Sequence, residues 1–342
     1  MAEILITLSE FFKLRKELPI IDARSEGEFA QSHILGAHNL PILNNKERVV
    51  IGTLYKEKGS EAATLKGFEL VGPRFHQIQK EAISLFPNRK IIVYCWRGGM
   101  RSQILSWLLE MVGFEVFRLK GGYKTYRTFT FEEVRKDRKL IVLGGKTGAA
   151  KTVLLQKLQE KGEQVLDLEG IANHKGSSFG GLPDQPSVEQ FENLVAEDLK
   201  NLDPSIPTWV ENESRRIGRL IVPDRLFEQM GKASLIDIQK SEQERIAHIA
   251  EEYGDLPEEE LISAVKRVQK KLGGLRTQEA IEAIQNKETT SWISNLLIYY
   301  DKTYEFDLTR HEAGKTQTLD LSGKTLTEQV ELLLKTKNQH HG

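Results

Sequence analysis

The chain has 342 residues, which is enough for two domains that each bury a core of their own. Its hydrophobic residues (39%), its charged residues (28%) and its formal net charge of -1 are ordinary for a globular protein, and they do not by themselves indicate a nucleic-acid-binding chain. No apolar run approaches the length of a transmembrane helix, the first 21 residues lack the apolar stretch of a signal peptide, and a single cysteine excludes an intramolecular disulfide. We therefore expect a cytoplasmic protein.

The N-terminal segment predicts a βα unit, with a helix over residues 8–18 and a short strand over residues 19–22. Two histidines, His33 and His38, follow in the string Ser-His-Ile-Leu-Gly-Ala-His. No second cluster with metal-ligand spacing accompanies them. We therefore interpret both histidines as structural and expect no metal from them.

The only cysteine lies at the end of a predicted strand over residues 91–94, in a glycine-containing loop before a predicted helix over residues 102–111. Loop amides and a helix N-terminus favour an anion, and Arg97 and Arg101 add positive charge. We therefore expect Cys95 to act as a nucleophilic thiolate, with Arg97 and Arg101 as its catalytic partners.

Three interpretations of this loop stay open at the level of the residues. An isolated cysteine after an apolar strand is often a buried small hydrophobic side chain. The spacing from Cys95 to Arg101 is also the C-x5-R spacing of cysteine phosphatases, although Tyr94 stands where those enzymes usually have histidine and no general acid is evident. The same loop can carry a persulfide or perselenide to an acceptor.

A basic segment follows the next predicted strand, which covers residues 114–119. Residues 113–151 contain ten lysines and arginines and four acidic residues, a net charge of +6. The charge is compatible with a solvated linker between domains and with a nucleic-acid-binding surface. The candidates for nucleic-acid binding are Arg118, Lys120, Lys124, Arg127, Arg135 and Lys136.

A phosphate-binding loop is predicted between a strand over residues 139–143 and a helix that begins near Lys151. The order strand, glycine-rich loop, helix is that of a P-loop, except that Ala150 replaces the usual second glycine. If this position needs a positive φ, alanine is strained there. The predicted phosphate-binding residues are Gly145, Lys146, Thr147, Gly148, Lys151 and Thr152.

Two further segments supply candidates for the same site. Residues 174–181 form a polar, glycine-containing loop, and residues 209–218 read as a strand end with acidic groups, where a P-loop protein holds a metal or a water. The alternative is that these carboxylates simply pair with neighbouring arginines. The candidates are His174, Lys175, Ser177, Ser178, Glu211, Glu213, Arg215 and Arg216. Amphipathic helices are expected over residues 241–287, and a polar helix from residue 324.

Two resemblances sharpen this organisation. The string Asp-x-Arg, Glu-Phe and Ser-His-Ile-x-Gly-Ala-x-Asn-Leu-Pro (residues 22–41), the cysteine loop and the Lys-Gly-Gly-Tyr turn at residues 120–123 resemble a rhodanese domain. That resemblance covers residues 8–127 and implies a parallel sheet flanked by helices. Over its whole length the chain resembles the bacterial tRNA 2-selenouridine synthase family, on the strings at residues 52–56, 94–102, 122–127, 174–180, 211–218 and 273–277.

The fold class that follows is α/β, with a rhodanese-like parallel-sheet domain (residues 8–131), a P-loop NTPase-like domain with a helical part (residues 138–310) and a C-terminal strand and helix tail (residues 311–342). The resemblance implies a transferase that acts on tRNA. It would replace the sulfur of wobble-position 2-thiouridine with selenium from selenophosphate, through an S-geranyl intermediate made from geranyl diphosphate.

In that scheme the P-loop holds either a nucleotide or the prenyl diphosphate, Mg²⁺ is a possible cofactor, and the basic segment contacts tRNA. The alternatives are a rhodanese-type sulfurtransferase, or a C-x5-R cysteine phosphatase, with a nucleotide-binding P-loop module.

Overall fold

The computed structural model describes residues 4–174, 184–312 and 314–341. The chain divides into two compact units: the first contains the residues up to Glu133 together with Glu192–Leu194, and the second contains the remainder from Val134. Within the described residues, no helix is both long enough and apolar enough to cross a membrane.

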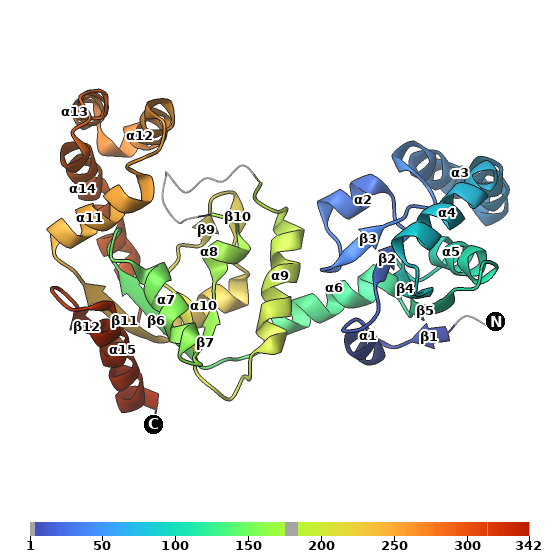
Figure 1. Cartoon of the computed structure of the whole chain (residues 1–342), viewed down its shortest axis with the longest axis horizontal. Coiled ribbons are helices and arrows are strands. Elements are labelled where there is room, and N and C mark those ends of the chain that lie inside the picture. The colour runs from blue at the N-terminus through green and yellow to red at the C-terminus, as the bar shows by residue number, and fades with distance from the viewer. Residues whose placement is uncertain (1–3, 175–183, 313, 342) are drawn as a thin grey trace. The chain divides into compact units, whose positions relative to one another are not determined.

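The first unit is built on a parallel five-stranded sheet in the order β1-β5-β4-β2-β3 (Figure 1). Its central strand β4 is buried at four of its five residues, which explains the continuous apolar run in the sequence. The strands are β1 (Ile4–Ile6), β2 (Ile20–Asp22), β3 (Ala37–Asn39), β4 (Lys90–Tyr94) and β5 (Glu115–Leu119).

Helices connect these strands, as parallel pairing requires. They are α1 (Leu8–Leu14), α2 (Glu26–Gln31), α3 (Asn45–Val71), the short 3-10 helix η1 (Gly72–Arg74), α4 (Phe75–Leu85), α5 (Met100–Glu110) and α6 (Gly122–Glu133). The predicted end of the first helix at residue 18 is wrong, because α1 stops at Leu14. Pro19 disfavours a helical conformation at Leu18, and residues 15–17 form turns instead.

The long helix α3 was not predicted from the sequence. It begins with a capping box between Asn44 and Glu47, and Gly59, with φ of 86°, interrupts it. Several of its large apolar residues are exposed, among them Val49, Tyr55 and Leu65. The helix therefore lacks the clear apolar stripe by which sequence patterns reveal helices.

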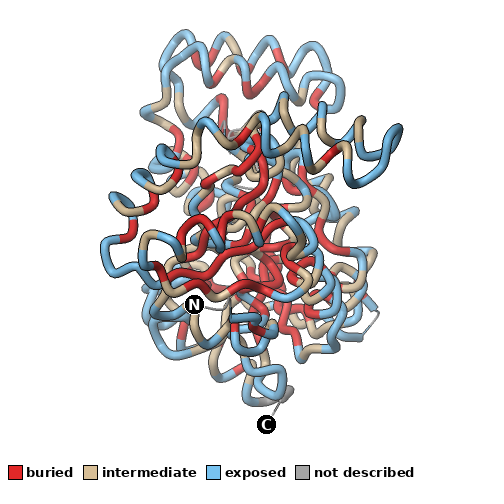
Figure 2. The backbone as a smooth tube through the Cα atoms, turned by 90° about the vertical axis from the view of Figure 1, so that its right-hand side faces the viewer, coloured by how far each residue is buried: buried red, intermediate tan, exposed pale blue. Residues whose placement is uncertain are grey.

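The second unit contains another parallel five-stranded sheet, in the order β12-β11-β6-β8-β7. Strand β6 lies at its centre, and all six of its residues are buried. Along the backbone of the chain, buried stretches alternate with exposed loops and helix faces (Figure 2). The strands are β6 (Leu140–Gly145), β7 (Gln164–Leu166), β8 (Thr208–Glu211), β11 (Ser234–Gln239) and β12 (Thr316–Asp320), with a separate antiparallel pair, β9 (Arg216–Ile217) and β10 (Leu220–Ile221).

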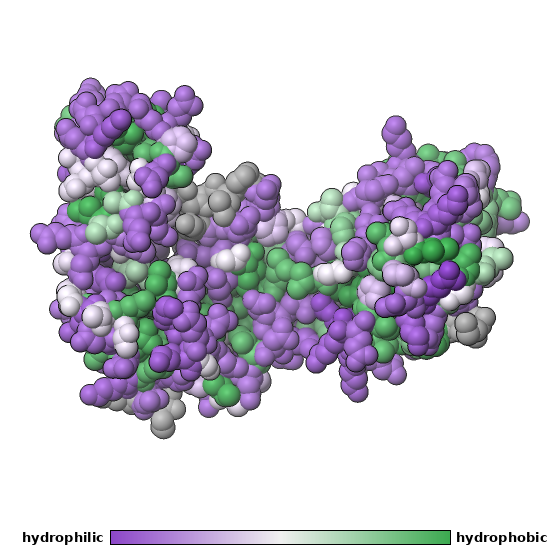
Figure 3. Space-filling view, in the orientation of Figure 1, coloured by the Kyte–Doolittle hydropathy of each residue, from purple (hydrophilic) through white to green (hydrophobic). Residues whose placement is uncertain are grey.

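The helices of this unit fall into two sets. Those that accompany the sheet are α7 (Lys151–Glu160), α8 (Leu168–Ile171), α9 (Val188–Asn201), α10 (Asp224–Lys232) and α15 (Leu326–His341). The helical group consists of α11 (Glu242–Tyr253), α12 (Glu258–Leu272), α13 (Gly274–Gln285) and α14 (Thr289–Leu308). It has its own apolar cluster, while the visible outer surface of α12 and α13 is largely hydrophilic (Figure 3). Amphipathic helices were predicted over residues 241–287, which contain α11, α12 and α13, whereas α14 was not predicted.

Candidate functional site

The phosphate loop joins the end of β6 to the start of α7. Gly148 has φ of 83°, and a Cβ there would lie 2.7 Å from the carbonyl oxygen of Arg245, so only glycine fits. Ala150, at the position of the missing glycine, adopts φ 61° and ψ 36°. Position 150 therefore does need a positive φ, and its alanine adopts the left-handed conformation that is strained for a residue with a Cβ.

Lys151 extends from the first turn of α7 back over the loop. Its Nζ donates a hydrogen bond of 3.0 Å to the carbonyl of Gly145 and lies 3.2 Å from Oε1 of Glu211. The hydroxyl oxygen of Thr152 lies 3.4 Å from a carboxylate oxygen of Glu169 and 3.4 Å from one of Glu211, so it can donate a weak hydrogen bond to either. The lysine charge and the threonine hydroxyl thus face a common group of acids.

Three carboxylates meet beside this lysine. Glu211 ends β8, Glu213 follows it, and Glu169 lies on α8 just after β7; one oxygen from each falls within 4.8 Å of the others. They come together because the carboxyl ends of the neighbouring parallel strands β6, β8 and β7 share one edge of the sheet. Glu169 was not predicted, although an acidic residue three positions after the end of a strand was the available signal.

Burial and mutual repulsion dominate the electrostatics of this group. Burial, followed by the neighbouring charge of Glu211, raises the pKa of Glu169 and of Glu213. Burial opposes the charge of Lys151, but Glu211, Glu169 and Glu213 outweigh it and raise the pKa of the lysine. The site therefore holds an excess of acid that a cation or protons must balance.

These groups line a cavity of about 600 Å³ within the second unit. Its wall includes the loop residues Gly145, Thr147, Gly148, Lys151 and Thr152, the three carboxylates, and one face of α14 with Trp292, Leu296 and Tyr300. The cavity thus combines a charged end, with Lys151 and the three carboxylates, and an apolar and aromatic wall.

Only some of the candidates from residues 174–181 and 209–218 line the cavity. His174 lines the cavity with Glu211 and Glu213, and burial lowers its pKa. Lys175, Ser177 and Ser178 lie outside the described residues. Arg215 and Arg216 are exposed and are not part of the cavity wall. The alternative pairing of the strand-end carboxylates with these arginines is wrong for Glu211, because its ion-pair partner is Lys151 and Arg215 pairs with Asp224 at 2.7 Å.

An arginine that the sequence did not single out anchors the phosphate loop. Arg245 of α11 is buried; its Nε donates a 2.8 Å hydrogen bond to the carbonyl of Thr147, and its other nitrogens bind Asp301 of α14. Lys146 turns toward the same helix and lies 3.3 Å from Asp301 and from Glu305. The helical group and the loop are therefore held as one assembly.

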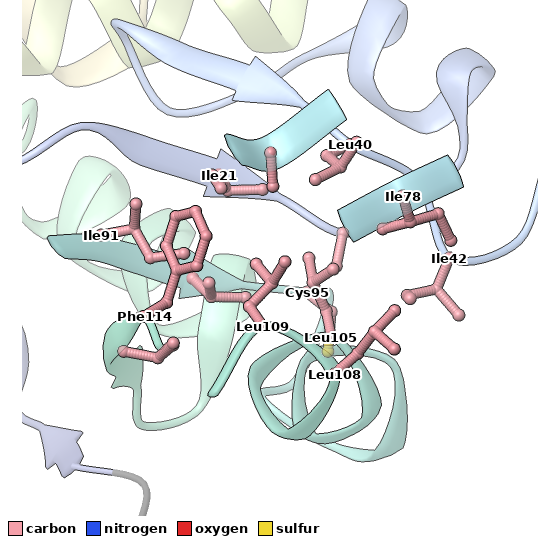
Figure 4. Close-up of a cluster of buried hydrophobic side chains, with 14 of the residues drawn as sticks. Ile21, Leu40, Ile42, Ile78, Ile91, Cys95, Leu105, Leu108, Leu109 and Phe114 are labelled. Carbon is pink, nitrogen blue, oxygen red and sulfur yellow. The ribbon is translucent and has the colours of Figure 1, made fainter. Parts of the chain in front are cut away.

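The cysteine loop of the first unit has a different environment. The side chain of Cys95 is 3% exposed; its Sγ lies 3.2 Å from Oγ of Ser102, and it packs in the apolar cluster with Leu105 and Leu108 (Figure 4). This burial is what the interpretation as a small core side chain describes. The same burial is compatible with a reactive thiol that becomes accessible only when the loop moves. The role of Cys95 as a nucleophile therefore remains a prediction.

The glycine turn at residues 120–123 supports this loop directly. The backbone N–H of Tyr123 donates a 2.8 Å hydrogen bond to the carbonyl of Cys95, and a Cβ on Gly122 would meet that carbonyl at 2.1 Å. A Cβ on Gly98, which has φ of 64°, would lie 2.8 Å from the carbonyl oxygen of Leu119. The two motifs are therefore parts of one structure.

The two arginines of the cysteine loop differ. Arg101 is held by Glu28 at 2.5 Å, and although burial opposes ionisation of Glu28, this pairing lowers the pKa of the carboxyl. Arg97 is exposed. Arg101 therefore fixes the helix end to α2, whereas Arg97 is accessible to an anion from solvent.

The basic residues proposed for nucleic-acid binding fall into a buried and an exposed group. Arg118 is buried and donates to the carbonyl of Gly98, and Arg127 is buried and pairs with Glu192 at 2.6 Å. Both have structural partners. The remaining candidates are exposed: Lys120, Lys124, Arg135 and Lys136.

Known protein families match both domains of the chain. The family model for the tRNA 2-selenouridine synthase AAA domain matches residues 138–332, and the rhodanese-like domain model matches residues 7–129. The chain belongs to the tRNA 2-selenouridine synthase family. This confirms the predicted fold class, and it makes the chain an enzyme of the transferase type.

Relatives named tRNA 2-selenouridine synthase match nearly end to end. The one from Sulfurovum sp. is 38% identical over 330 residues, which cover 86% of this chain and 89% of the relative. The one from Nitrosomonas europaea is 34% identical over 351 residues, covering 87% and 91%. The one from Pseudomonas putida is 33% identical over 363 residues, covering 95% and 96%.

Proposed function

We propose that this chain replaces the sulfur of 2-thiouridine at the wobble position of tRNA with selenium from selenophosphate, through an S-geranyl-2-thiouridine intermediate made from geranyl diphosphate. The name of the relatives supports the nucleic acid and the selenium product. The observation that supports the geranyl step is the cavity of the second unit, since its phosphate loop and its apolar wall suit a ligand with a diphosphate head and a hydrocarbon body.

In the first step the thiouridine sulfur bonds to C1 of the geranyl group, the C1–O bond breaks, and inorganic diphosphate leaves. Lys151 and the loop amides bind the diphosphate and stabilise the charge that develops on it. Geranylation also turns the sulfur into a group that departs as a thiol.

A divalent cation fits the acidic end of this cavity. Three carboxylates and the Thr152 hydroxyl are hard oxygen donors of the kind Mg²⁺ prefers, and the crowding of the three carboxylates, which together with burial raises the pKa of Glu169 and of Glu213, supports a cation at this place. Thr152, Glu169 and Glu211 would hold the ion. When bound, Mg²⁺ supplies positive charge to the diphosphate.

In the second step selenium from selenophosphate bonds to C2 of the base, the C2–S bond breaks, and geranyl thiol leaves; water then cleaves the Se–P bond and releases phosphate. We assign this step to the cysteine loop of the first unit. Arg97, which is exposed there, suits the charge of selenophosphate, and Cys95 at the start of the same loop is the residue whose substitution tests this assignment.

The exposed basic residues Lys120, Lys124, Arg135 and Lys136 are the proposed contacts to the tRNA backbone. Contacts of this kind release counterions, so the affinity for tRNA should fall as salt increases.

The test is mass spectrometry of nucleosides from 2-thiouridine tRNA incubated with the full chain, geranyl diphosphate and selenophosphate, with each omitted in turn. Omitting selenophosphate should leave S-geranyl-2-thiouridine, and omitting geranyl diphosphate should leave 2-thiouridine unchanged. Formation of 2-selenouridine without geranyl diphosphate would rule out the proposed intermediate.

A further inference from the structure

The cavity of the second unit has two unlike ends, and α14 runs between them. Residues of this helix that recur every three or four positions form its wall, from Trp292 through Leu296 and Tyr300 to Tyr304. One face of a single helix therefore follows the cavity along its length.

The position of each end follows from contacts to the sheet. The hydroxyl of Tyr304 donates a hydrogen bond to Asp237 of β11, and a Cβ on Gly144 would lie 2.6 Å from that hydroxyl. Tyr304 is thus beside the strand that leads into the phosphate loop. Trp292 precedes it by twelve positions, which is about 18 Å along a helix that rises 1.5 Å per residue.

The part of the wall at Trp292 is made by apolar side chains of the helical group. Trp292 is 2% exposed and belongs to the cluster of the helical group with Leu261, Val265 and Leu296. The opposite end carries Lys151 and the carboxylates, where an anionic head and a cation are expected. A prenyl diphosphate with its phosphates at the loop would extend its hydrocarbon along this wall toward the tryptophan.

We propose that Trp292, together with Leu296 one turn later, limits the length of the prenyl chain that the cavity accepts. This inference rests on the proposed function, in which a prenyl diphosphate is the occupant. Each five-carbon unit adds four carbon–carbon bonds of about 1.5 Å, or roughly 5 Å of extended chain. A diphosphate and two such units fit the distance from the loop to Trp292, whereas a third unit reaches the indole.

The inference gives a role to the bulky, buried aromatic residue in the cavity wall. A tightly packed interior does not yield by several ångströms, so a chain that is one unit too long must bend back or leave its last carbons outside. A chain that is one unit too short leaves apolar wall uncovered. The ten-carbon chain is therefore selected on both sides.

The experiment measures binding to the full chain by calorimetry, with inorganic diphosphate and with dimethylallyl, geranyl and farnesyl diphosphates as the probes. In the unchanged protein the geranyl compound should bind at least tenfold more tightly than either other prenyl compound. Trp292→Leu should improve farnesyl over geranyl diphosphate by tenfold or more, and Leu296→Ala should shift the same ratio by a smaller factor.

Leu261→Ala is the matched control, because Leu261 belongs to the same apolar cluster but not to the cavity wall. It should leave the ratio unchanged. Both ligands are measured on the same folded fraction, so partial loss of stability does not move the ratio, and Leu296→Ala decides the matter if Trp292→Leu does not fold.

The outcomes separate the two proposals. Equal binding of geranyl and farnesyl diphosphates, unaltered in the variants, would overturn the limit at Trp292 and leave the geranyl step standing. If prenyl diphosphates bind no more tightly than inorganic diphosphate, the cavity does not bind the hydrocarbon chain. Both proposals would then be wrong.

Discussion

The phosphate loop and the cysteine loop share a local design and differ in what surrounds them. Each follows a buried central strand of a parallel sheet, contains glycines with positive φ, and leads into a helix. Lys151 faces a cavity of about 600 Å³ with three carboxylates, whereas Cys95 is 3% exposed among apolar side chains. The difference arises from the neighbouring helices, since the helical group leaves space in front of one loop and α5 packs against the other.

We assign separate reaction steps to the two loops. Substituting Lys151 in one loop and Cys95 in the other should give the largest effects. Lys151→Ala should lower the rate of geranylation by about 10²–10³-fold, because it removes the charge that stabilises the leaving diphosphate. Cys95→Ser should abolish selenation and leave geranylation intact. Both rates are read from the modified nucleosides by mass spectrometry.

Lys157→Ala is the control for the lysine, since Lys157 lies on the same helix α7 and pairs only with Glu160 at 2.7 Å among the contacts described. It should leave both steps unchanged. Loss of both steps in Cys95→Ser would mean that Cys95 is structural or that the two steps share one site.

A smaller effect is expected from weakening the ion pair of Arg101, which anchors the cysteine loop to α2. Glu28→Gln should lower the free energy of unfolding of the first unit by about 2 kcal/mol at neutral pH, because it weakens a charged hydrogen bond in a partly buried site. Since Arg101 lowers the pKa of Glu28 in the folded protein, this stabilisation is present above the unfolded value of 4.5 and is lost as the pH falls through the folded value.

Urea unfolding between about pH 3 and pH 7 measures this, and the variant should show the weaker dependence on pH in that range. Glu26→Gln is the control, because Glu26 lies on the same helix and its carboxylate contacts only the backbone N–H of Asn45 at 3.1 Å in the interactions described. An identical pH dependence for Glu28→Gln and the unchanged protein would show that the pair does not anchor the loop.

The smallest expected effect tests the backbone of the phosphate loop. Ala150→Gly should raise the free energy of unfolding of the second unit by about 1 kcal/mol, because glycine adopts the left-handed conformation without a Cβ clash. Ala149→Gly, at the adjacent buried position without positive φ, should lower it by a similar amount. Urea unfolding of both variants measures the pair, and a loss of stability in Ala150→Gly would contradict the strain.

Local patterns were enough to predict several parts of this protein. The apolar run before Cys95, the order of strand, glycine loop and helix around Lys151, and the consequence of Ala150 all depend on residues that are neighbours in the chain. Those features are confirmed because backbone conformation and short periodicity are determined mainly by adjacent residues. The helix α3 escaped prediction because exposed apolar residues and Gly59 obscure its pattern.

Features made by residues far apart in the chain were decided by the tertiary structure alone. Glu169 joins Glu211 and Glu213 only because β7 and β8 end at the same edge of the sheet, and Arg245 reaches Thr147 across 98 positions. The burial of Cys95, the pairing of Arg101 with Glu28, and the apolar wall from α14 likewise depend on which helix packs against which strand. Sequence determined where the two loops lie and which residues they carry, and packing determined which of them opens into a cavity, because space in a close-packed interior is set by distant neighbours.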